Sequence, residues 1–285
     1  MSNKVAIVTD STSYLPKECI DQYHISIIPL SVVWGDQVLL DGVDVQPAEY
    51  YERLSKSKVM PTTSQVTPAA MLGTFQPLLE QGYDVLSIFI SSKFSGTIQS
   101  AMQARDMLDG AASRLAIVDS LSTTMAMGWP VLTAARAAQA GESLSECRTV
   151  AENACKNSGV LFVVETLEFL RRGGRIGGAS ALLGTALNIK PVLEMRDGRI
   201  ESVEKIRTKH KAIQRMLDLA TERINGRTPV RVAVTHANAE ADASSLLQQA
   251  SDRFNPVETI ISPLSPVIGT HAGPGTVALN FMAGN

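Results

Sequence analysis

Short runs of apolar, largely β-branched residues recur along the first half of the chain. They cover residues 5–8, 27–34, 85–90 and 115–118, and most are followed by a polar segment and then by apolar residues at helical spacing. Unbroken apolar runs of this length are typical of strands buried on both faces. Strands that alternate with helices indicate a parallel sheet, whose ligands usually lie beyond the carboxyl ends of the strands.

Three hydroxyl-rich segments follow these strands or precede helices, at residues 9–13, 61–65 and 91–97. The third lies at the start of a predicted helix, where free backbone N–H groups and the positive end of the helix dipole favour an anion. The hydroxyls of Ser95 and Thr97 would supply further donors. Simple helix capping is the alternative, because Ser and Thr are preferred caps in any helix. Since the strand ends share one edge of the sheet, we expect the three segments to converge.

The pattern changes near residue 158. Residues 160–164 predict a strand, and Asp197-Gly198 is typical of a hairpin turn between strands at 189–195 and 200–206. We therefore predict an α/β protein of two domains with the ligand in the cleft between them. Residues 1–158 would form a parallel sheet with flanking helices, and residues 159–285 a mixed or antiparallel α/β domain. Further strands are predicted at 230–235 and 257–262, and helices after Thr67, Ser143 and Thr208 and from Pro130.

Composition and charge exclude several classes of function. The 285 residues are 45% hydrophobic, with 26 basic and 28 acidic side chains and a net charge of -2. This balance supplies no positive field for nucleic acid or an anionic membrane. No apolar stretch approaches the ~20 residues that span a bilayer. Cys19, Cys147 and Cys155 are an odd set without a C-x-x-C pair, and no signal-peptide core precedes the first strand, so we expect reduced thiols and a cytoplasmic location.

Cofactor and metal motifs are missing from the sequence. Ala179 stands where a phosphate-binding loop starting at Gly173 would need lysine, and no dinucleotide fingerprint or H-E-x-x-H occurs. We therefore expect no cofactor and no metal. A serine hydrolase with Ser95 as nucleophile and His271 as base remains an alternative, although the G-x-S-x-G elbow is absent. His271 could equally make a structural hydrogen bond in a rigid glycine-rich loop, and Arg172 could be a solvated helix end or an anion clamp.

Six short motifs are spread along the chain. They are Thr9-Asp10-Ser11-Thr12, Asp41-Gly42-Val43-Asp44, Pro61-Thr62-Thr63-Ser64-Gln65, Phe94-Ser95-Gly96-Thr97, Leu170-Arg171-Arg172-Gly173-Gly174-Arg175-Ile176 and Gly269-Thr270-His271-Ala272-Gly273-Pro274-Gly275. With these motifs, the chain resembles the DegV family, the fatty-acid-binding subunits of bacterial fatty-acid kinases, over essentially its whole length. Lys93-Phe94 and Ile98 depart from the usual family pattern.

The resemblance implies a long-chain fatty acid whose carboxylate is held by Thr63 and Ser95, with His271 and Arg172 close by. It implies no catalysis by this chain alone, because in that family a separate kinase subunit phosphorylates the bound carboxylate. The carboxylate must then face outward, so basic side chains near it are candidates for docking the kinase. The ligand set extends to the motif neighbours Thr62, Ser64, Gly96 and Thr97, and the docking candidates are Arg172, Lys205, Arg207 and Lys209.

Overall fold

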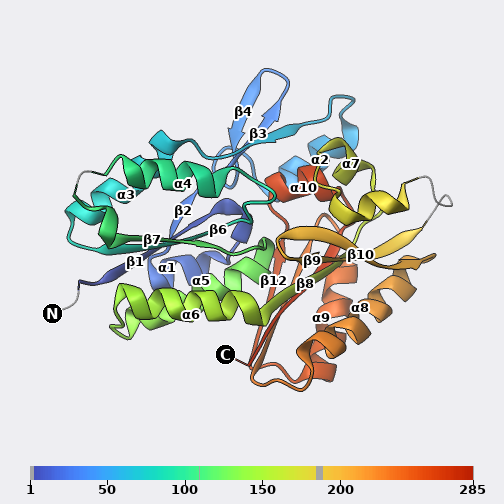
Figure 1. Cartoon of the computed structure of the whole chain (residues 1–285). Helices are drawn as coiled ribbons and strands as arrows, with labels where there is room; N and C mark the ends of the chain where they lie inside the picture. Colours follow the sequence, from blue (N-terminus) through green and yellow to red (C-terminus); the bar gives the residue numbers. More distant parts are fainter. Residues whose placement is uncertain (1–2, 109, 184–188, 285) are drawn as a thin grey trace.

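The first half of the chain folds around a four-stranded parallel sheet, as the alternation of strands and helices predicts. The computed structural model describes residues 3–108, 110–183 and 189–284. Helices cover both faces of this sheet (Figure 1). The strand order is β2 (Ser26–Ile28), β1 (Val5–Asp10), β6 (Asp84–Phe89) and β7 (Leu115–Asp119). One face packs on α3 (Pro68–Glu80) and α4 (Thr97–Asp106), and the other on α1 (Lys17–Tyr23), α5 (Thr124–Gln139) and α6 (Leu144–Asn157).

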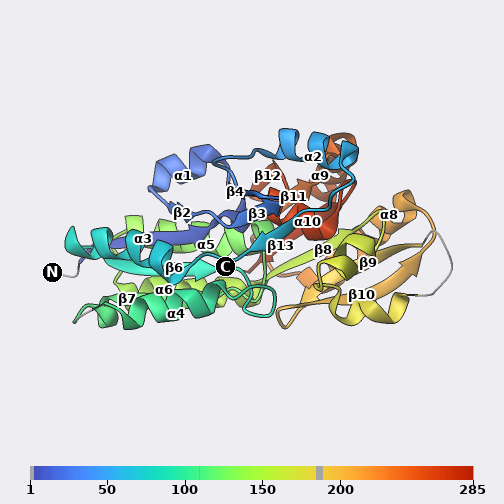
Figure 2. The same cartoon turned by 90° about the horizontal axis from the view of Figure 1, so that it is seen from above.

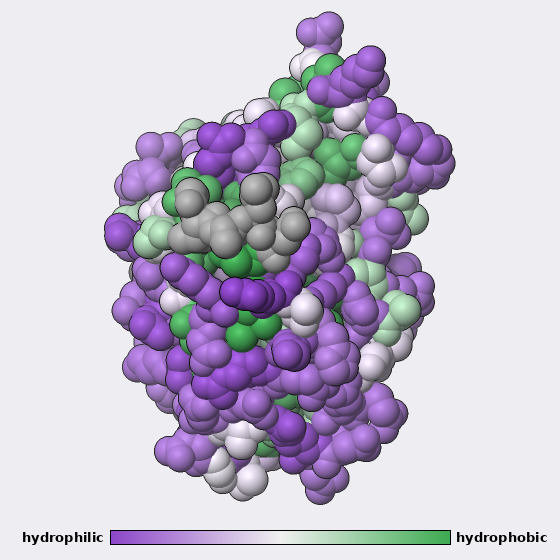
Figure 3. Space-filling model, turned by 90° about the vertical axis from the view of Figure 1, so that its right-hand side faces the viewer, coloured by the Kyte–Doolittle hydropathy of each residue, from purple (hydrophilic) through white to green (hydrophobic). Residues whose placement is uncertain are grey.

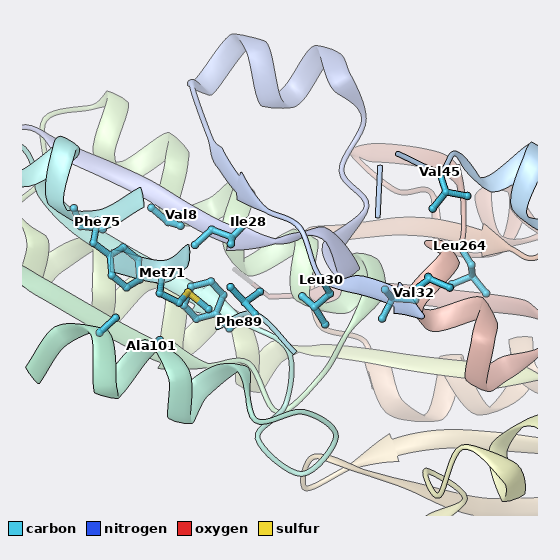
Figure 4. Packing of buried hydrophobic residues seen from close by; sticks show 14 of the residues in the cluster. Val8, Ile28, Leu30, Val32, Val45, Met71, Phe75, Phe89, Ala101 and Leu264 are labelled. Carbon is cyan, nitrogen blue, oxygen red and sulfur yellow. The ribbon is translucent and has the colours of Figure 1, made fainter. Parts of the chain in front are cut away.

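A small antiparallel sheet extends from this core, in the order β4 (Gln37–Leu40), β3 (Ser31–Trp34) and β5 (Thr62–Ser64), with α2 (Pro47–Lys56) nearby. Figure 4 shows one hydrophobic cluster that runs from Phe75 and Met71 on α3, past Val8, to Val32 on β3. Two predictions were wrong here. The strand expected at 27–34 is broken at Pro29, because proline has no N–H for a sheet, and the hydroxyl-rich segment at 61–65, for which no strand was predicted, contains β5.

The second half forms a six-stranded mixed sheet beside the first, as Figures 1 and 2 show. The order is β10 (Arg199–Ile206), β9 (Lys190–Arg196), β8 (Ser158–Val163), β13 (Val277–Ala283), β11 (Val230–His236) and β12 (Glu258–Pro263). Its neighbours pair antiparallel except β11 and β12. One face packs on α8 (Lys209–Ile224) and α9 (Glu240–Phe254). We propose a domain boundary near residue 158, because β8 begins there and the described strands after it all join this sheet.

Local sequence signals located several element ends. Ser143 and Glu146 form the predicted capping box of α6, Thr67 and Thr208 cap α3 and α8, and the β9–β10 hairpin turns at Asp197-Gly198. Pro130, expected to start a helix, lies inside α5, whose start at Thr124 was not recognised. The expected loop around His271 contains α10 (Pro266–Ala272), which begins with a Ser265 cap and Pro266 at its first turn. None of the helices in the described part of the chain is long and apolar enough to cross a membrane.

Candidate ligand-binding cavity

A cavity of about 340 Å³ lies between the two large sheets. Its size falls within the range of small-molecule pockets. Strands β8, β9 and β10 supply part of the wall from one side, and α10, β5 with Gln65 after it, and the segment after β6 supply part from the other. Most of the lining is apolar. The apolar lining residues are Leu30, Ile90, Phe94, Val160, Phe162, Leu170, Met195, Ile200, Leu264, Val267, Ile268, Ala272 and Ala278.

One region of the cavity is polar and centres on Thr63 and His271. Thr63 lies on β5 and His271 in the last turn of α10, and Thr63 Oγ1 is 2.8 Å from His271 Nε2. A Cβ atom on Gly173 would lie 2.0 Å from His271 Nδ1, so glycine is required for the ring to sit here. Burial lowers the pKa of His271 to about 4, and the charge of Arg175 adds to this shift. The imidazole is therefore neutral at pH 7.

The segment after β6 lies against the segment that contains Thr63. Ser95 and Gly96 line the cavity, and Ser95 Oγ is 2.8 Å from Thr97 Oγ1. A Cβ on Gly96 would lie 2.0 Å from Gln65 Oε1, and Gln65 Nε2 donates to Ser100 Oγ at 3.1 Å. Two of the three hydroxyl-rich segments therefore converge as expected. The helix-capping interpretation is met in part: Ser95 Oγ accepts a hydrogen bond from the backbone N–H of Thr97, the first residue of α4, at 3.3 Å, although the N-cap residue itself is Gly96.

The third hydroxyl-rich segment, residues 9–13, lies outside the cavity wall. None of its residues lines the cavity. Asp10 instead accepts hydrogen bonds from the backbone N–H of Ile90, at 2.7 Å, and of Thr12, at 2.9 Å. Ser11 Oγ donates to Asp41 Oδ2 at 2.9 Å. This buried network holds the end of β6 and thereby positions the segment that carries Ser95.

The arginine that lines the cavity is Arg175, and not the expected Arg172. Arg172 has a side chain that is 55% exposed, and it donates to Glu168 one turn earlier on α7 (Glu168–Arg172). After this helix the chain turns through Gly174, at a φ of +70°, and brings Arg175 inward. Arg175 Nη1 donates to the carbonyl of Gly173 at 2.6 Å and Nε to that of Phe94 at 3.2 Å. Sequence reasoning missed Arg175, although it stands in the same glycine and arginine motif.

The remaining predicted site residues lie at different depths. Ser64 lines the cavity, whereas Thr62 and Thr97 do not. Lys205 and Arg207 are exposed. Lys209 is half-buried and forms ion pairs with Glu165 at 2.9 Å and Asp242 at 2.7 Å. Lys209 thus has a structural role close to Gly275, whose carbonyl also accepts a hydrogen bond from its ammonium group.

The geometry gives little support to a hydrolytic Ser95–His271 pair. His271 Nε2 faces Thr63, and Ser95 Oγ faces Thr97. Within the described chain, His271 Nδ1 is buried and has no hydrogen-bond partner, so no carboxylate orients the ring as in a catalytic triad. Among the described residues, no cluster of His, Cys, Asp and Glu could hold a metal ion.

Comparisons with known proteins agree with this architecture. The chain is 39% identical over 281 residues to a DegV domain-containing protein of Streptomyces coelicolor, with 98% of each chain covered. Its fold matches two solved structures described as fatty-acid-binding DegV proteins. For the one from Thermus thermophilus the TM-score is 0.92, at 34% identity and with 98% of this chain and 99% of the other covered. For the one from Bacillus subtilis the TM-score is 0.90, at 35% identity and with 99% and 100% covered.

The motifs recognised in the sequence and these likenesses in structure extend over the same length of chain. A family model, described as that of uncharacterised proteins of the DegV family, matches residues 4–284. The chain belongs to the DegV family.

Proposed function

We propose that this protein binds a long-chain fatty acid in the cavity between the two sheets. The observation that carries the proposal is an apolar cavity with the Thr63–His271 pair, Ser95 and Arg175 in its wall. A fatty acid has the same division into one polar head and a long apolar tail. The fatty-acid-binding Thermus thermophilus and Bacillus subtilis proteins, with the same fold, support this assignment.

The carboxylate would lie at Thr63 and Ser95. Because His271 is neutral at pH 7, its Nε2–H can donate to Thr63 Oγ1, 2.8 Å away. The Thr63 hydroxyl is then free to donate its own proton to a carboxylate oxygen. The guanidinium of Arg175 adds positive charge to the same region. Arg175 thereby takes the place that the sequence prediction gave to Arg172.

The tail would contribute most of the affinity. Burying ~14 methylenes at ~0.8 kcal/mol each is worth on the order of 11 kcal/mol before the costs of binding. A hydrogen bond to a charged group contributes only ~1.5–3 kcal/mol. The apolar walls therefore determine how tightly the ligand binds, and the hydroxyl groups determine where its carboxylate lies.

We further propose that the bound carboxylate is presented to a separate kinase subunit, which phosphorylates it with ATP, in the cytoplasm. Exposed cations on elements that line the cavity support a docking role. Arg172 follows the lining residue Leu170 on α7, and Lys205 and Arg207 lie at the end of β10, which carries the lining residue Ile200. The face of the molecule on the β10 side is mainly hydrophilic (Figure 3). Lys209 suits docking less well, because its charge is already paired.

The decisive experiment is to denature the purified protein, extract it with organic solvent and analyse the extract by mass spectrometry. We expect about one acyl carboxylate per chain. The same preparation is assayed with p-nitrophenyl acyl esters. An extract without acyl carboxylate, together with ester hydrolysis that Ser95→Ala abolishes, would replace the binding role by a hydrolase.

A further inference from the structure

The exposed part of the cavity wall lies beside the proposed carboxylate site. Among the described residues that line the cavity, Ser64 and Gln65 are exposed, and all the others are buried or half-buried. Both follow Thr63 directly in the chain. The carboxylate of a bound fatty acid would therefore lie near the opening to solvent, and its hydrocarbon tail in the enclosed part of the cavity.

The side-chain amide of Gln65 is held in place at this opening. Its Nε2 donates to Ser100 Oγ on α4 at 3.1 Å. The amide also packs on Gly96, because a Cβ atom added to Gly96 would collide with the oxygen, carbon and nitrogen of this group. Gly96 follows Ser95, the second residue proposed to bind the carboxylate. Gln65 thus lies close to this site, and its amide nitrogen has a second N–H to donate.

Phosphorylation of the carboxylate would place a larger and more highly charged group at this opening. In the proposed reaction, a carboxylate oxygen forms a bond to the γ-phosphorus of ATP. The bond from that phosphorus to the oxygen that bridges it to the β-phosphate breaks, and ADP leaves. The carboxylate is already deprotonated, so no proton is released. The phosphoryl oxygens of the acyl phosphate would then lie on the solvent side of Thr63 and Ser95, towards Ser64 and Gln65.

The polar groups around this opening suit an anion. No Asp or Glu is among the described residues that line the cavity, and Arg175 supplies positive charge. The hydroxyl of Ser64 donates to the carbonyl of Gln65 at 3.4 Å. A hydrogen bond of this length is weak, so a phosphoryl oxygen can replace its acceptor. The described wall therefore offers two hydrogen-bond donors at the opening and no negative side chain.

We infer that Gln65, together with Ser64, forms a subsite for the phosphoryl group of an acyl phosphate. The free N–H of the Gln65 amide and the hydroxyl of Ser64 donate to phosphoryl oxygens, while Thr63 and Ser95 hold the acyl oxygen. This inference rests on the proposed function. It adds that the protein binds the phosphorylated product through groups that the free acid does not need.

The test compares two ligands in calorimetric titrations of the delipidated protein. One is octadecanoic acid. The other is the phosphonate analogue of octadecanoyl phosphate, in which a CH2 group replaces the anhydride oxygen and prevents hydrolysis. Gln65→Met removes the amide with little change in side-chain length, and Ser64→Ala removes the second donor. Gln103→Met is the matched control, because Gln103 is exposed on α4 and does not line the cavity.

In the parent, we expect the two ligands to bind with affinities within about tenfold of each other. Gln65→Met should weaken phosphonate binding about tenfold and Ser64→Ala about threefold, while the affinity for the acid changes less than about twofold. Gln103→Met should bind both ligands as the parent does. Denaturation curves check that each variant is folded.

An equal loss for both ligands in Gln65→Met overturns the inference and leaves Gln65 as a support for Gly96. Unchanged phosphonate binding in both variants, or a parent that binds the acid but not the phosphonate, also overturns it and leaves the proposed binding of a fatty acid standing. If the parent binds neither ligand, the proposed function fails and the inference falls with it.

Discussion

At the scale of single residues, the proposed carboxylate site depends on a hydrogen bond between side chains that are 208 positions apart in the sequence. Thr63 comes from the edge of a small sheet and His271 from a short helix. Together the two side chains form a neutral hydrogen-bond donor group at the wall of an apolar cavity. Two residue-scale predictions follow from the chemistry of this pair.

Thr63→Val removes the proposed donor to the carboxylate with little change in volume. We expect fatty-acid affinity to fall about ten- to a hundredfold, since hydrogen bonds to charged groups contribute ~1.5–3 kcal/mol. Titration calorimetry measures the affinity, and chemical denaturation the free energy of unfolding. Thr62→Val is the control, because Thr62 is exposed and does not line the cavity. A variant that loses several kcal/mol of stability but binds normally when folded would assign Thr63 a purely structural role.

His271 makes stability depend on pH in a defined direction. Its pKa is about 4 in the folded protein, and an unfolded histidine has a pKa near 6.5. The unfolded chain therefore binds the proton more readily, and stability falls as the pH is lowered from 6.5 towards 4. Over this interval the parent should lose about 3 kcal/mol more than His271→Gln. Denaturation curves at several pH values test this, with the exposed His210→Gln as control.

The comparison with a variant is necessary because two buried carboxyl groups act in the opposite direction. Burial raises the pKa of Asp10 to about 6 and that of Asp41 to about 7. Their contribution to stability is largest at low pH and is lost as the pH rises towards 7. Parent and variant share both groups, so their effect cancels in the difference. Equal pH dependence of the parent and His271→Gln would contradict the low pKa of His271.

At the scale of elements, the contact between α7 and α10 decides whether His271 can reach Thr63. Gly173 ends α7 with a φ of -74°, which any residue can adopt, so its need for glycine is steric and not conformational. A methyl group there would meet His271 Nδ1 at 2.0 Å. His271 belongs to helix α10, so its imidazole cannot easily move aside as the end of a long flexible side chain could.

Gly173→Ala should therefore displace His271 and weaken fatty-acid binding at least tenfold, as loss of one hydrogen bond to a charged ligand does. Gly73→Ala is the matched control. Gly73 lies inside α3 with nothing within 4 Å of an added Cβ, so this change should leave binding intact and stabilise the helix by up to about 1 kcal/mol. Normal affinity of Gly173→Ala would show that the site tolerates a shifted imidazole.

At the scale of the whole molecule, the cavity exists because the two large sheets lie side by side. Helix α5 connects them, since it packs against β1 and β6 of the first sheet and against β8 and β13 of the second. Its N-terminus brings Thr123 to the cavity. The exposed cations of α7 and β10 lie on the outer surface of the second half and do not line the cavity. The proposed binding of the acid and the proposed docking of a kinase would therefore be separable properties.

Arg172→Ala and Arg207→Ala should retain bound fatty acid but slow its phosphorylation by the cognate kinase several-fold at low salt. The difference from the parent should narrow as ionic strength increases, because salt screens interactions between exposed charges. Initial rates of acyl-phosphate formation over a range of binding-protein concentrations provide the measurement. Lys17→Ala, an exposed change on α1, is the control. Rates equal to the parent at every concentration and salt level would place the docking surface elsewhere.

The sequence by itself determined the family and the features that depend on neighbouring residues. The capping box at Ser143 and Glu146, the cap at Thr208 and the hairpin turn at Asp197-Gly198 are such features, because their hydrogen bonds or dihedral angles involve only a few consecutive positions. The alternation of strands and helices predicted the fold class, because each element could be recognised from the apolar pattern of its own residues.

Only the tertiary structure decided which distant residues meet. Strand β13 pairs with β8 and β11, remote in sequence, and the short β5 depends on pairing with β3, so neither had a sufficient local signal. The inward turn after α7 selected Arg175 over Arg172. Asn280, far along the chain, caps α5 and leaves Thr123 without a partner. Long-range packing controls these outcomes, because a side chain's partner is set by the whole fold and not by its neighbours in sequence.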